Sequence, residues 1–244
     1  MEENVLILGA TSDMAVAIAR QLATEGYSIT LAARSTERLS ALEGDLRVRH
    51  KALVNSVYFD ALDFGNHEAF YNALPEKPDV VICVFGLLGD QKKGEHDWQH
   101  CSDIISSNYT GAVSILNVVA NDFERRKKGV IVGISSVAGE RGRQSNYIYG
   151  SAKAGFTAYL SGLRNRLYHH GAHVLTVKPG FVKTKMIEDL KTPGPLTASP
   201  KTVGKNVSRA IRSKKNSIYV LPIWRLIMLV IKTIPEGIFK KLRL

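Results

Sequence analysis

The sequence predicts an α/β protein in which helices cover both faces of one parallel sheet. Short apolar runs alternate along the chain with segments whose apolar residues recur at helical spacing. Runs that are apolar at every position are typical of strands buried on both faces, as in a parallel sheet. The 244 residues, of which 45% are hydrophobic, suffice for one sizeable core in a single domain.

The expected elements follow in chain order. Residues 5–8 form the first strand, and residues 13–25 have the apolar spacing of a helix that Gly26 closes. Residues 183–202 contain three prolines and little periodicity, which predicts a mobile loop at the carboxyl edge of the sheet, a common place for a substrate lid. The later strands are expected at residues 28–32, 57–59, 79–84, 129–134, 172–177 and 218–222. We divide the chain into a domain of residues 1–222 and a C-terminal segment of residues 223–244.

The cysteines and histidines predict no metal site. Cys83 and Cys101 do not form a CxxC pair. The acidic start Met1–Glu3 is not a secretory signal, so reduced thiols and a cytoplasmic location are expected. His169, His170 and His173 have poor spacing for metal ligands, and we expect them at the surface. His96 and His100 are four residues apart on a possible helix, but no carboxylate pattern beyond Asp97 accompanies them, so no metal is expected there either.

The strand, turn and helix of residues 5–25 have the organisation of a dinucleotide-binding site. The turn, Gly9–Ala15, would place a pyrophosphate at the free N–H groups of the helix N-terminus. Asp13 and Ala15 stand where a glycine-rich fingerprint has glycines. A carboxylate near a pyrophosphate is repulsive, so we expect Asp13 to turn outward and cap the helix. An ordinary strand-to-helix connection is the alternative interpretation.

The end of the second strand bears on the choice of cofactor. An NAD site has a carboxylate there for the ribose 2′-hydroxyl, whereas an NADP site has a cation for the 2′-phosphate. The sequence at this point is Ala32-Ala33-Arg34-Ser35, with an arginine and no acid. It predicts NADP(H), with a solvated surface arginine as the alternative.

A phenol and an ammonium group stand four residues apart at Tyr149 and Lys153, which places them on one face of a helix. A neighbouring cation stabilises phenolate and would lower the pKa of Tyr149 from about 10 toward neutrality. Such a tyrosine can donate a proton to a carbonyl oxygen while hydride arrives at the carbon. Ser136 follows the apolar strand before this pair, at the sheet edge where α/β sites lie, and Asn108 precedes Ser136 by 28 residues.

In type, order and spacing these four residues resemble the catalytic tetrad of the classical short-chain dehydrogenase/reductase family. The resemblance runs from about Val5 to Thr184 and implies a Rossmann-type, doubly wound parallel sheet, a nicotinamide cofactor and hydride transfer. It implies that Tyr149 is the acid/base and that Ser136 orients the substrate carbonyl. It also implies that Lys153 lowers the tyrosine pKa and holds the nicotinamide ribose, and that Asn108 supports a proton relay through water.

The resemblance also extends to the cofactor. Thr184 would touch the carboxamide and Asp60 matches an acid near the adenine, whereas we expect Asp63 to cap the next helix. The family's Asn-Asn-Ala-Gly is Cys83-Val84-Phe85-Gly86 here, with only the glycine kept. The expected cofactor-binding residues are Gly9, Thr11, Ser12, Asp13, Met14, Arg34, Ser35, Asp60, Gly86, Lys153, Pro179, Gly180, Val182 and Thr184.

A narrower resemblance lies in residues 136–141, residues 145–151 and the C-terminal segment. They are similar to reductases of the decaprenylphosphoryl-2-keto-pentose type, which reduce a sugar ketone on a polyprenyl-phosphate carrier. This resemblance implies a lipid-linked ketone substrate, although such motifs fix a substrate poorly.

The C-terminal segment is basic and apolar. Residues 201–244 carry eleven Lys and Arg residues against one acid, Glu236, and so hold most of the net charge of +11. Residues 223–232 are apolar on nearly every face but too short to span a bilayer, which needs about 20 residues. Trp224 with flanking cations suits the surface of an anionic membrane. The alternative is a helix that packs on the core or between the subunits of a homo-oligomer.

Three functions remain open. The first is an NADP(H)-dependent carbonyl reductase, peripheral at the membrane, that acts on a lipid-linked or other apolar ketone. The second is a soluble reductase of a small substrate. The third is a nucleotide-binding regulator without turnover; nucleic acid is not an expected partner, because no basic groove interleaved with aromatic residues is visible.

Overall fold

The computed structural model describes residues 3–188 and 192–242. Seven parallel strands form the central sheet in the order β3-β2-β1-β4-β5-β6-β9. Their bounds are Asn4–Leu8 for β1, Ser28–Ala33 for β2, Val54–Tyr58 for β3, Val80–Cys83 for β4, Val130–Ile134 for β5, His173–Lys178 for β6 and Ser217–Tyr219 for β9. The predicted doubly wound α/β fold is confirmed.

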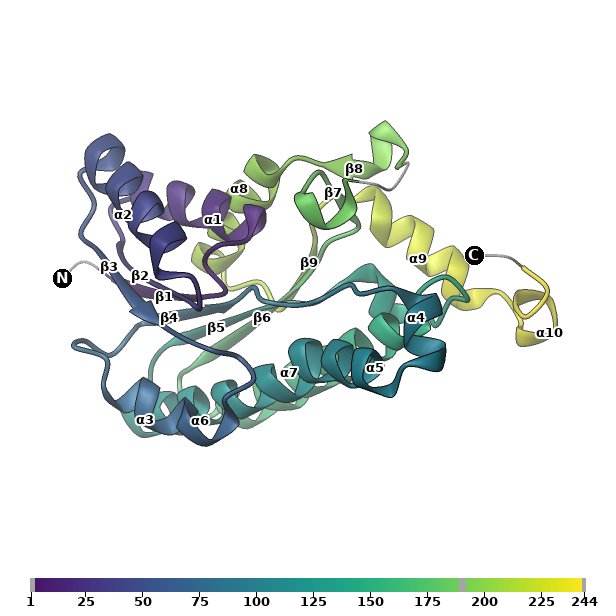
Figure 1. The fold of residues 1–244 in the computed structure, drawn as a ribbon, viewed down its shortest axis with the longest axis horizontal. Helices are drawn as coiled ribbons and strands as arrows, with labels where there is room; N and C mark the ends of the chain where they lie inside the picture. The colour runs from purple at the N-terminus through teal and green to yellow at the C-terminus, as the bar shows by residue number, and fades with distance from the viewer. Residues whose placement is uncertain (1–2, 189–191, 243–244) are drawn as a thin grey trace.

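Helices cover both faces of the sheet (Figure 1). On one face lie α1 (Asp13–Thr24), α2 (Thr36–His50) and α8 (Pro200–Arg212), and on the other lie α3 (His67–Asn72), α6 (Gly111–Arg126) and α7 (Tyr147–Tyr168). Each face has its own apolar core, because alternate side chains of the buried strands point to opposite sides. Strands buried on both faces are apolar throughout, which is why the sequence reveals them.

The third strand differs from its expected position. It spans Val54–Tyr58 rather than residues 57–59, and only Val54 within it is fully buried. The strand lies at the edge of the sheet, where one side meets solvent, so it lacks the continuous apolar run used to find the others. The last strand is also shorter than expected and ends at Tyr219 rather than at residue 222.

The loops and short helices at the carboxyl ends of the strands build the rest of the molecule. After β4 come α4 (Gln91–His96), α5 (Trp98–Ile105) and a π-helical turn (Ser106–Thr110), and after β5 comes a 3-10 turn, η3 (Val137–Glu140). The expected loop of residues 183–202 is not irregular throughout. It contains the turns η4 (Lys185–Ile187) and η5 (Gly194–Leu196) and the strand β8 (Thr197–Ala198), which pairs with β7 (Phe181–Val182), and α8 already begins at Pro200.

The C-terminal segment folds as α9 (Ile223–Thr233) and the short α10 (Glu236–Phe239). Figure 1 shows α9 at the same end of the sheet as α4 and α5. Trp224 and Met228 are buried against Val137, so α9 packs on the domain through one of its faces. No helix in the described part of the chain combines the length and the apolar character needed to cross a membrane.

Candidate active site

The sheet topology creates a crevice at the carboxyl ends of its central strands. β1 pairs with β2 on one side and with β4 on the other, so the strand order reverses beside β1. Ligands of open α/β sheets bind at such a switch point, where loops diverge to opposite faces. All four predicted catalytic residues lie in the elements that follow β4 and β5.

Asn108 sits in the π-helical turn between α5 and α6, a distortion that is frequent at functional sites. Its side chain is buried, and Nδ2 donates to the carbonyl oxygens of Leu87 at 2.6 Å and Ile104 at 2.8 Å. These two bonds leave Oδ1 as a buried acceptor with no partner among the described residues. A β-carbon added at Gly86 would lie 2.6 Å from this oxygen and 3.2 Å from Lys153 Nζ, so Gly86 is needed to keep the space between them open.

Lys153 and Tyr149 lie one turn apart on α7, as predicted. Lys153 is buried, its Nζ donates to the carbonyl oxygen of Ile134 at 3.1 Å, and it lies 5.8 Å from the centre of the Tyr149 ring. Ser136, directly after β5, is also buried, and its Oγ accepts a hydrogen bond from the N–H of Ala138 at 3.1 Å. Ser136 also forms a hydrogen bond with Tyr149, so its hydroxyl lies beside the phenol oxygen.

The expected lowering of the tyrosine pKa is wrong for the protein without cofactor. Burial raises the pKa of Tyr149 to about 12, and a hydrogen bond from Ser136 opposes this only in part. Burial also lowers the pKa of Lys153 to about 8. Near neutral pH, Tyr149 therefore keeps its proton, and Lys153 is still mostly charged. The arrangement suits donation of a proton by Tyr149.

The turn after β1 has the geometry of a dinucleotide site. Gly9 adopts φ +85°, and a β-carbon there would meet Phe85 at 2.7 Å, so the turn requires glycine. Ser12, not Asp13, caps α1 by accepting from the N–H of Ala15. The Asp13 carboxylate instead accepts a hydrogen bond from the backbone N–H of Lys185 at 2.8 Å. Asp13 thus ties the turn to the segment after β7, which corrects the expectation that it caps the helix.

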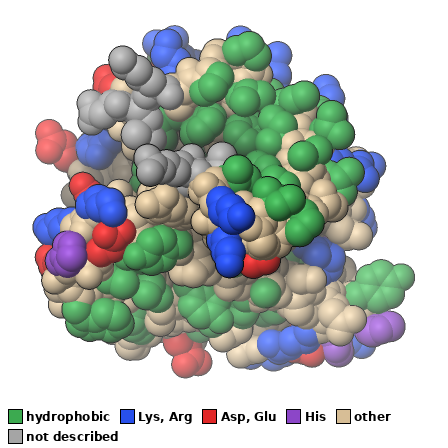
Figure 2. Space-filling model, turned by 90° about the vertical axis from the view of Figure 1, so that its right-hand side faces the viewer, with side chains coloured by type: hydrophobic (Ala, Val, Ile, Leu, Met, Phe, Trp, Pro, Cys, Tyr) green, Lys and Arg blue, Asp and Glu red, His purple; other side chains and the backbone are tan. Residues whose placement is uncertain are grey.

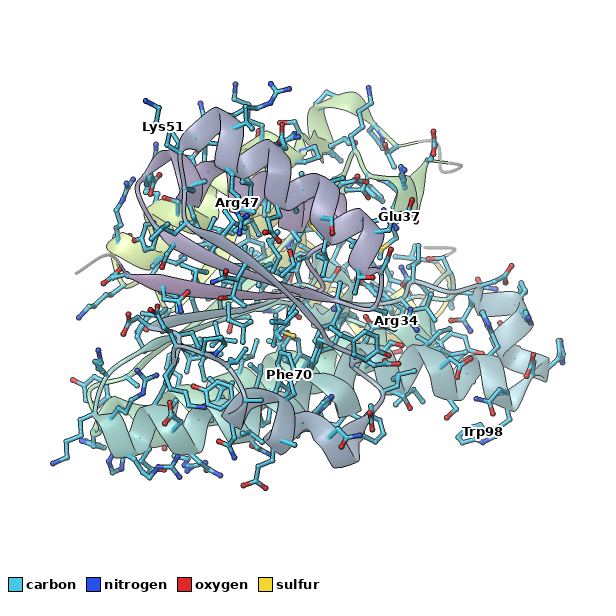
Figure 3. All side chains as sticks on the ribbon, turned by 60° about the vertical axis from the view of Figure 1, so that its left-hand side comes forward. Arg34, Glu37, Arg47, Lys51, Phe70 and Trp98 are labelled. Atoms are coloured by element: carbon cyan, nitrogen blue, oxygen red, sulfur yellow. The ribbon has the colours of Figure 1, made fainter. Side chains whose placement is uncertain are left out.

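Two arginines stand at the end of β2. Arg34 is exposed, and Figure 3 shows it at the opposite end of α2 from Arg47 and Lys51. Arg38, one turn into α2, reaches the dinucleotide turn and donates to the carbonyl oxygen of Thr11 at 3.3 Å. Ser35 caps α2 through the N–H of Arg38. Arg38 was not among the predicted cofactor-binding residues. Its position three residues after the capping Ser35 places it in the first turn of α2, close to Arg34, and could have indicated its place beside the cofactor.

The remaining predicted cofactor residues lie along the same edge. Asp60 follows β3 and its carboxylate accepts from the N–H of Leu62 at 3.0 Å, whereas Asp63 bonds the side chain of Asn66 and makes no capping bond. Thr184 lines a groove of about 1290 Å³ between α1 and residues 183–188 and 192–201 that also includes Asp13 and Lys185. The Pro179 carbonyl accepts from the N–H of Val137, which joins the predicted carboxamide segment to the Ser136 turn.

The donor set fits a phosphorylated dinucleotide. The Ser12-capped helix N-terminus offers N–H groups, and two cations stand beside the end of β2. Neither Arg34 nor Arg38 forms an ion pair within residues 3–188 and 192–242. In the same described residues no three His, Cys, Asp or Glu side chains group together as metal ligands would.

Sequence comparisons identify the family. The model of the short chain dehydrogenase family matches residues 3–193. An oxidoreductase of Mycobacterium tuberculosis (strain ATCC 25618 / H37Rv) is 33% identical over 241 residues, which cover 98% of this chain and 96% of the relative. An oxidoreductase of Streptomyces coelicolor is 34% identical over 245 residues, with 98% and 95% covered.

Solved structures share the fold. A short-chain dehydrogenase from Sphingobium yanoikuyae, solved with NADPH, has a TM-score of 0.83 and 22% identity over 99% of this chain and 96% of its own. A short chain dehydrogenase from Burkholderia cenocepacia J2315, solved with NADP, has a TM-score of 0.84 and 17% identity, with 98% and 97% covered.

The buried amino group of Lys153 predicts a pH-dependent cost in stability. Its folded-state pKa of about 8 lies below the ordinary 10.5, so the folded protein binds this proton less tightly than the unfolded chain does. Below about pH 8 the cost is complete, and stability rises with pH between the two values. Lys153→Met removes the cation and keeps an unbranched side chain.

We expect Lys153→Met to raise the free energy of unfolding at pH 7 by about 1 kcal/mol, net of the lost hydrogen bond to Ile134. The gain should shrink from pH 8 to pH 10, because wild-type Lys153 is then neutral in the folded state. Urea unfolding followed by circular dichroism at pH 7 and pH 10 measures both effects. A Met variant that is less stable than the wild type at pH 7 contradicts the pKa assignment.

Proposed function

The chain belongs to the short-chain dehydrogenase family of oxidoreductases, and we propose that it is an NADPH-dependent reductase that converts a ketone into an alcohol, with Tyr149 as the proton donor. One observation carries the proposal: Asn108, Lys153 and the Tyr149–Ser136 pair meet at the carboxyl ends of β4 and β5. A regulator without turnover would have no need of a buried, partly desolvated lysine there.

Each residue has one task in the proposed reaction. NADPH, held at the Gly9 turn and by Arg34 and Arg38, would supply a hydride to the carbonyl carbon. The Ser136 hydroxyl donates a hydrogen bond to the carbonyl oxygen, and Tyr149 transfers its phenolic proton to the same oxygen. The charge of Lys153 stabilises the resulting phenolate, and the free Oδ1 of Asn108 can accept from a water that returns a proton through Lys153.

The preference for NADPH rests on Arg34 and Arg38. Both stand where the 2′-phosphate of the adenosine would lie, and β2 ends without a carboxylate. The Sphingobium and Burkholderia relatives, solved with NADPH and NADP, share this fold.

We extend the proposal to a substrate with a large apolar part, such as a lipid-linked keto-sugar, met at an anionic membrane surface. α9 buries Trp224 and Met228 but exposes an opposite apolar face. Cations accompany that face, and Figure 2 shows hydrophobic side chains gathered on this side of the molecule with Lys and Arg among them. On α9 the exposed apolar residues are Ile223, Leu226, Leu229 and Val230, and the exposed cations are Arg225 and Lys232. In and after α10, Ile238, Lys240 and Lys241 are also exposed.

Tyr149→Phe tests the reaction directly. It removes the proton donor but leaves the ring in place, so ketone reduction should fall by at least about 100-fold. The Kd of NADPH, measured by its fluorescence, should change by less than about threefold. A panel of alkyl, cyclic and aryl ketones with NADPH provides the assay. A Phe variant that reduces ketones at near wild-type rates overturns the mechanism, and a wild type that reduces none favours the regulator.

Arg34→Asp tests the choice of cofactor. A carboxylate at this position repels a 2′-phosphate and can accept from a 2′-hydroxyl, so the ratio of kcat/KM for NADPH over NADH should fall below one. Arg38→Ala should weaken NADPH binding by about tenfold and leave NADH binding nearly unchanged. Equal use of both cofactors by the wild type contradicts the assignment.

Co-sedimentation with anionic vesicles tests the membrane surface. Leu226 and Leu229 are each 59% exposed on α9, and Leu53, 69% exposed before β3, serves as the control. We expect the wild type and Leu53→Glu to sediment with phosphatidylglycerol vesicles at low salt and the Leu226→Glu/Leu229→Glu variant to stay in solution. Binding should weaken at high salt without vanishing, because the apolar contact is not screened.

A wild type that stays in the supernatant contradicts the membrane surface. If the double Glu substitution then dissociates an oligomer, the exposed face of α9 is a subunit interface.

A further inference from the structure

One arginine joins the C-terminal segment to the catalytic loop. Arg141 follows η3, five residues after Ser136, and its Nη1 donates to three carbonyl oxygens at the end of α9. The distances are 2.9 Å to Ile231, 3.1 Å to Lys232 and 2.6 Å to Ile234. The last carbonyls of a helix lack partners within the helix, and a cation at that end also meets the negative pole of the helix dipole.

The same guanidinium reaches past α9 into the next element. Its Nη2 donates to the Glu236 carboxylate at 2.9 Å, and its Cζ lies 3.8 Å from the centre of the Phe239 ring. Only 15% of the Arg141 side chain is exposed, whereas 77% of the Glu236 side chain is. The bonds to the carbonyls of Ile231 and Ile234, which are partly buried, therefore dominate the attachment, because an exposed ion pair contributes little.

The segment held in this way packs against the catalytic loop and the backbone after β6. Trp224 packs edge-on against Phe181 and donates from Nε1 to the carbonyl oxygen of Leu196. A β-carbon at Gly180 would lie 2.0 Å from the Trp224 ring, so the backbone after β6 approaches the indole closely. α9 therefore touches the loop that carries Ser136, the segment predicted to hold the nicotinamide carboxamide, and the end of η5.

A second, independent contact holds the catalytic loop to the sheet. The buried carboxylate of Glu140 accepts from Lys178 Nζ at 2.6 Å and from the Tyr219 hydroxyl at 2.7 Å. Lys178 ends β6 and Tyr219 ends β9. Loss of the Arg141 contacts would thus release the end of α9 and α10, while Trp224 and Met228 still hold the start of α9 and Glu140 keeps the Ser136 turn in place.

We propose that Arg141 is a positioning residue that locks α9 and α10 over the site, so that the C-terminal segment forms one wall of the substrate pocket. The inference rests on the proposed reductase activity. Arg141 acts on substrate binding through the segment it holds, and it does not act on the cofactor or on the proton transfer. Because the same segment presents the exposed apolar face, whatever covers that face is coupled to the substrate pocket through Arg141.

Steady-state kinetics and hydrogen exchange test the proposal together. In Arg141→Ala, the KM of the most rapidly reduced ketone of the panel should rise at least tenfold. The kcat should stay within about threefold and the Kd of NADPH within about twofold. Amide exchange in residues 223–239 should become faster, whereas exchange in α7 should not change. Arg209→Ala removes an exposed arginine from α8 that makes no side-chain hydrogen bond in the described part of the chain, and it should match the wild type.

Two further variants separate the contacts. Glu236→Gln removes only the exposed ion pair and should change KM by less than threefold. Arg141→Lys keeps the charge but cannot span the carbonyls and the carboxylate together, so its KM should lie between those of the wild type and the Ala variant. If Arg141→Ala does not fold, the KM and the amide exchange of Arg141→Lys test the proposal in its place.

Two results overturn the proposal. One is unchanged KM and unchanged exchange in both Arg141 variants. The other is an equal loss of kcat, ketone binding and NADPH binding, which would indicate general disruption. A wild type that reduces no ketone overturns the proposed function and with it the positioning role, while faster exchange in Arg141→Ala would still establish the attachment of the segment.

Discussion

The docking of α7 against the end of β5 is the contact on which the site depends. Lys153 Nζ donates to the carbonyl oxygen of Ile134, and Ser135 Oγ returns a bond to the carbonyl oxygen of Lys153 at 3.1 Å while it also bonds Thr157 at 2.6 Å. Gly139 lets the turn after β5 approach closely, because a β-carbon there would lie 2.6 Å from the Lys153 backbone. These bonds fix the helix in rotation and height, and so set where the phenol of Tyr149 stands relative to Ser136.

Burial at this contact also sets the protonation states. Desolvation penalises both the phenolate of Tyr149 and the ammonium of Lys153, and it shifts their pKa values in opposite directions. The protein alone therefore holds a proton on the tyrosine and a readily lost proton on the lysine. This arrangement favours reduction, in which the tyrosine must donate, and the lysine can pass on a replacement proton.

Much of this could be predicted from local sequence, and the remainder depends on contacts that are distant in sequence. Doubly buried strands are visible as apolar runs, and four-residue spacing places Tyr149 and Lys153 on one helix face. The edge strand β3 was misplaced because one of its sides meets solvent. The bond between Lys185 and Asp13 joins residues that are 172 positions apart, and the Arg141 contacts with α9 join residues about 90 positions apart. The spacing of apolar residues along the chain cannot predict such contacts. The pKa of Tyr149 was expected to fall because spacing reveals a neighbouring cation but not the depth of burial.

The ionisation of Tyr149 tests the account most directly. In protein labelled with ¹³C at the tyrosine ζ position, the Tyr149 signal can be assigned by its loss in Tyr149→Phe and followed by NMR as the pH rises. The account predicts that in the protein without cofactor this signal keeps the chemical shift of a phenol through pH 10, since burial raises the pKa to about 12. A phenolate shift that appears below pH 9 would show that the Lys153 cation outweighs desolvation, and would contradict a site poised to donate a proton.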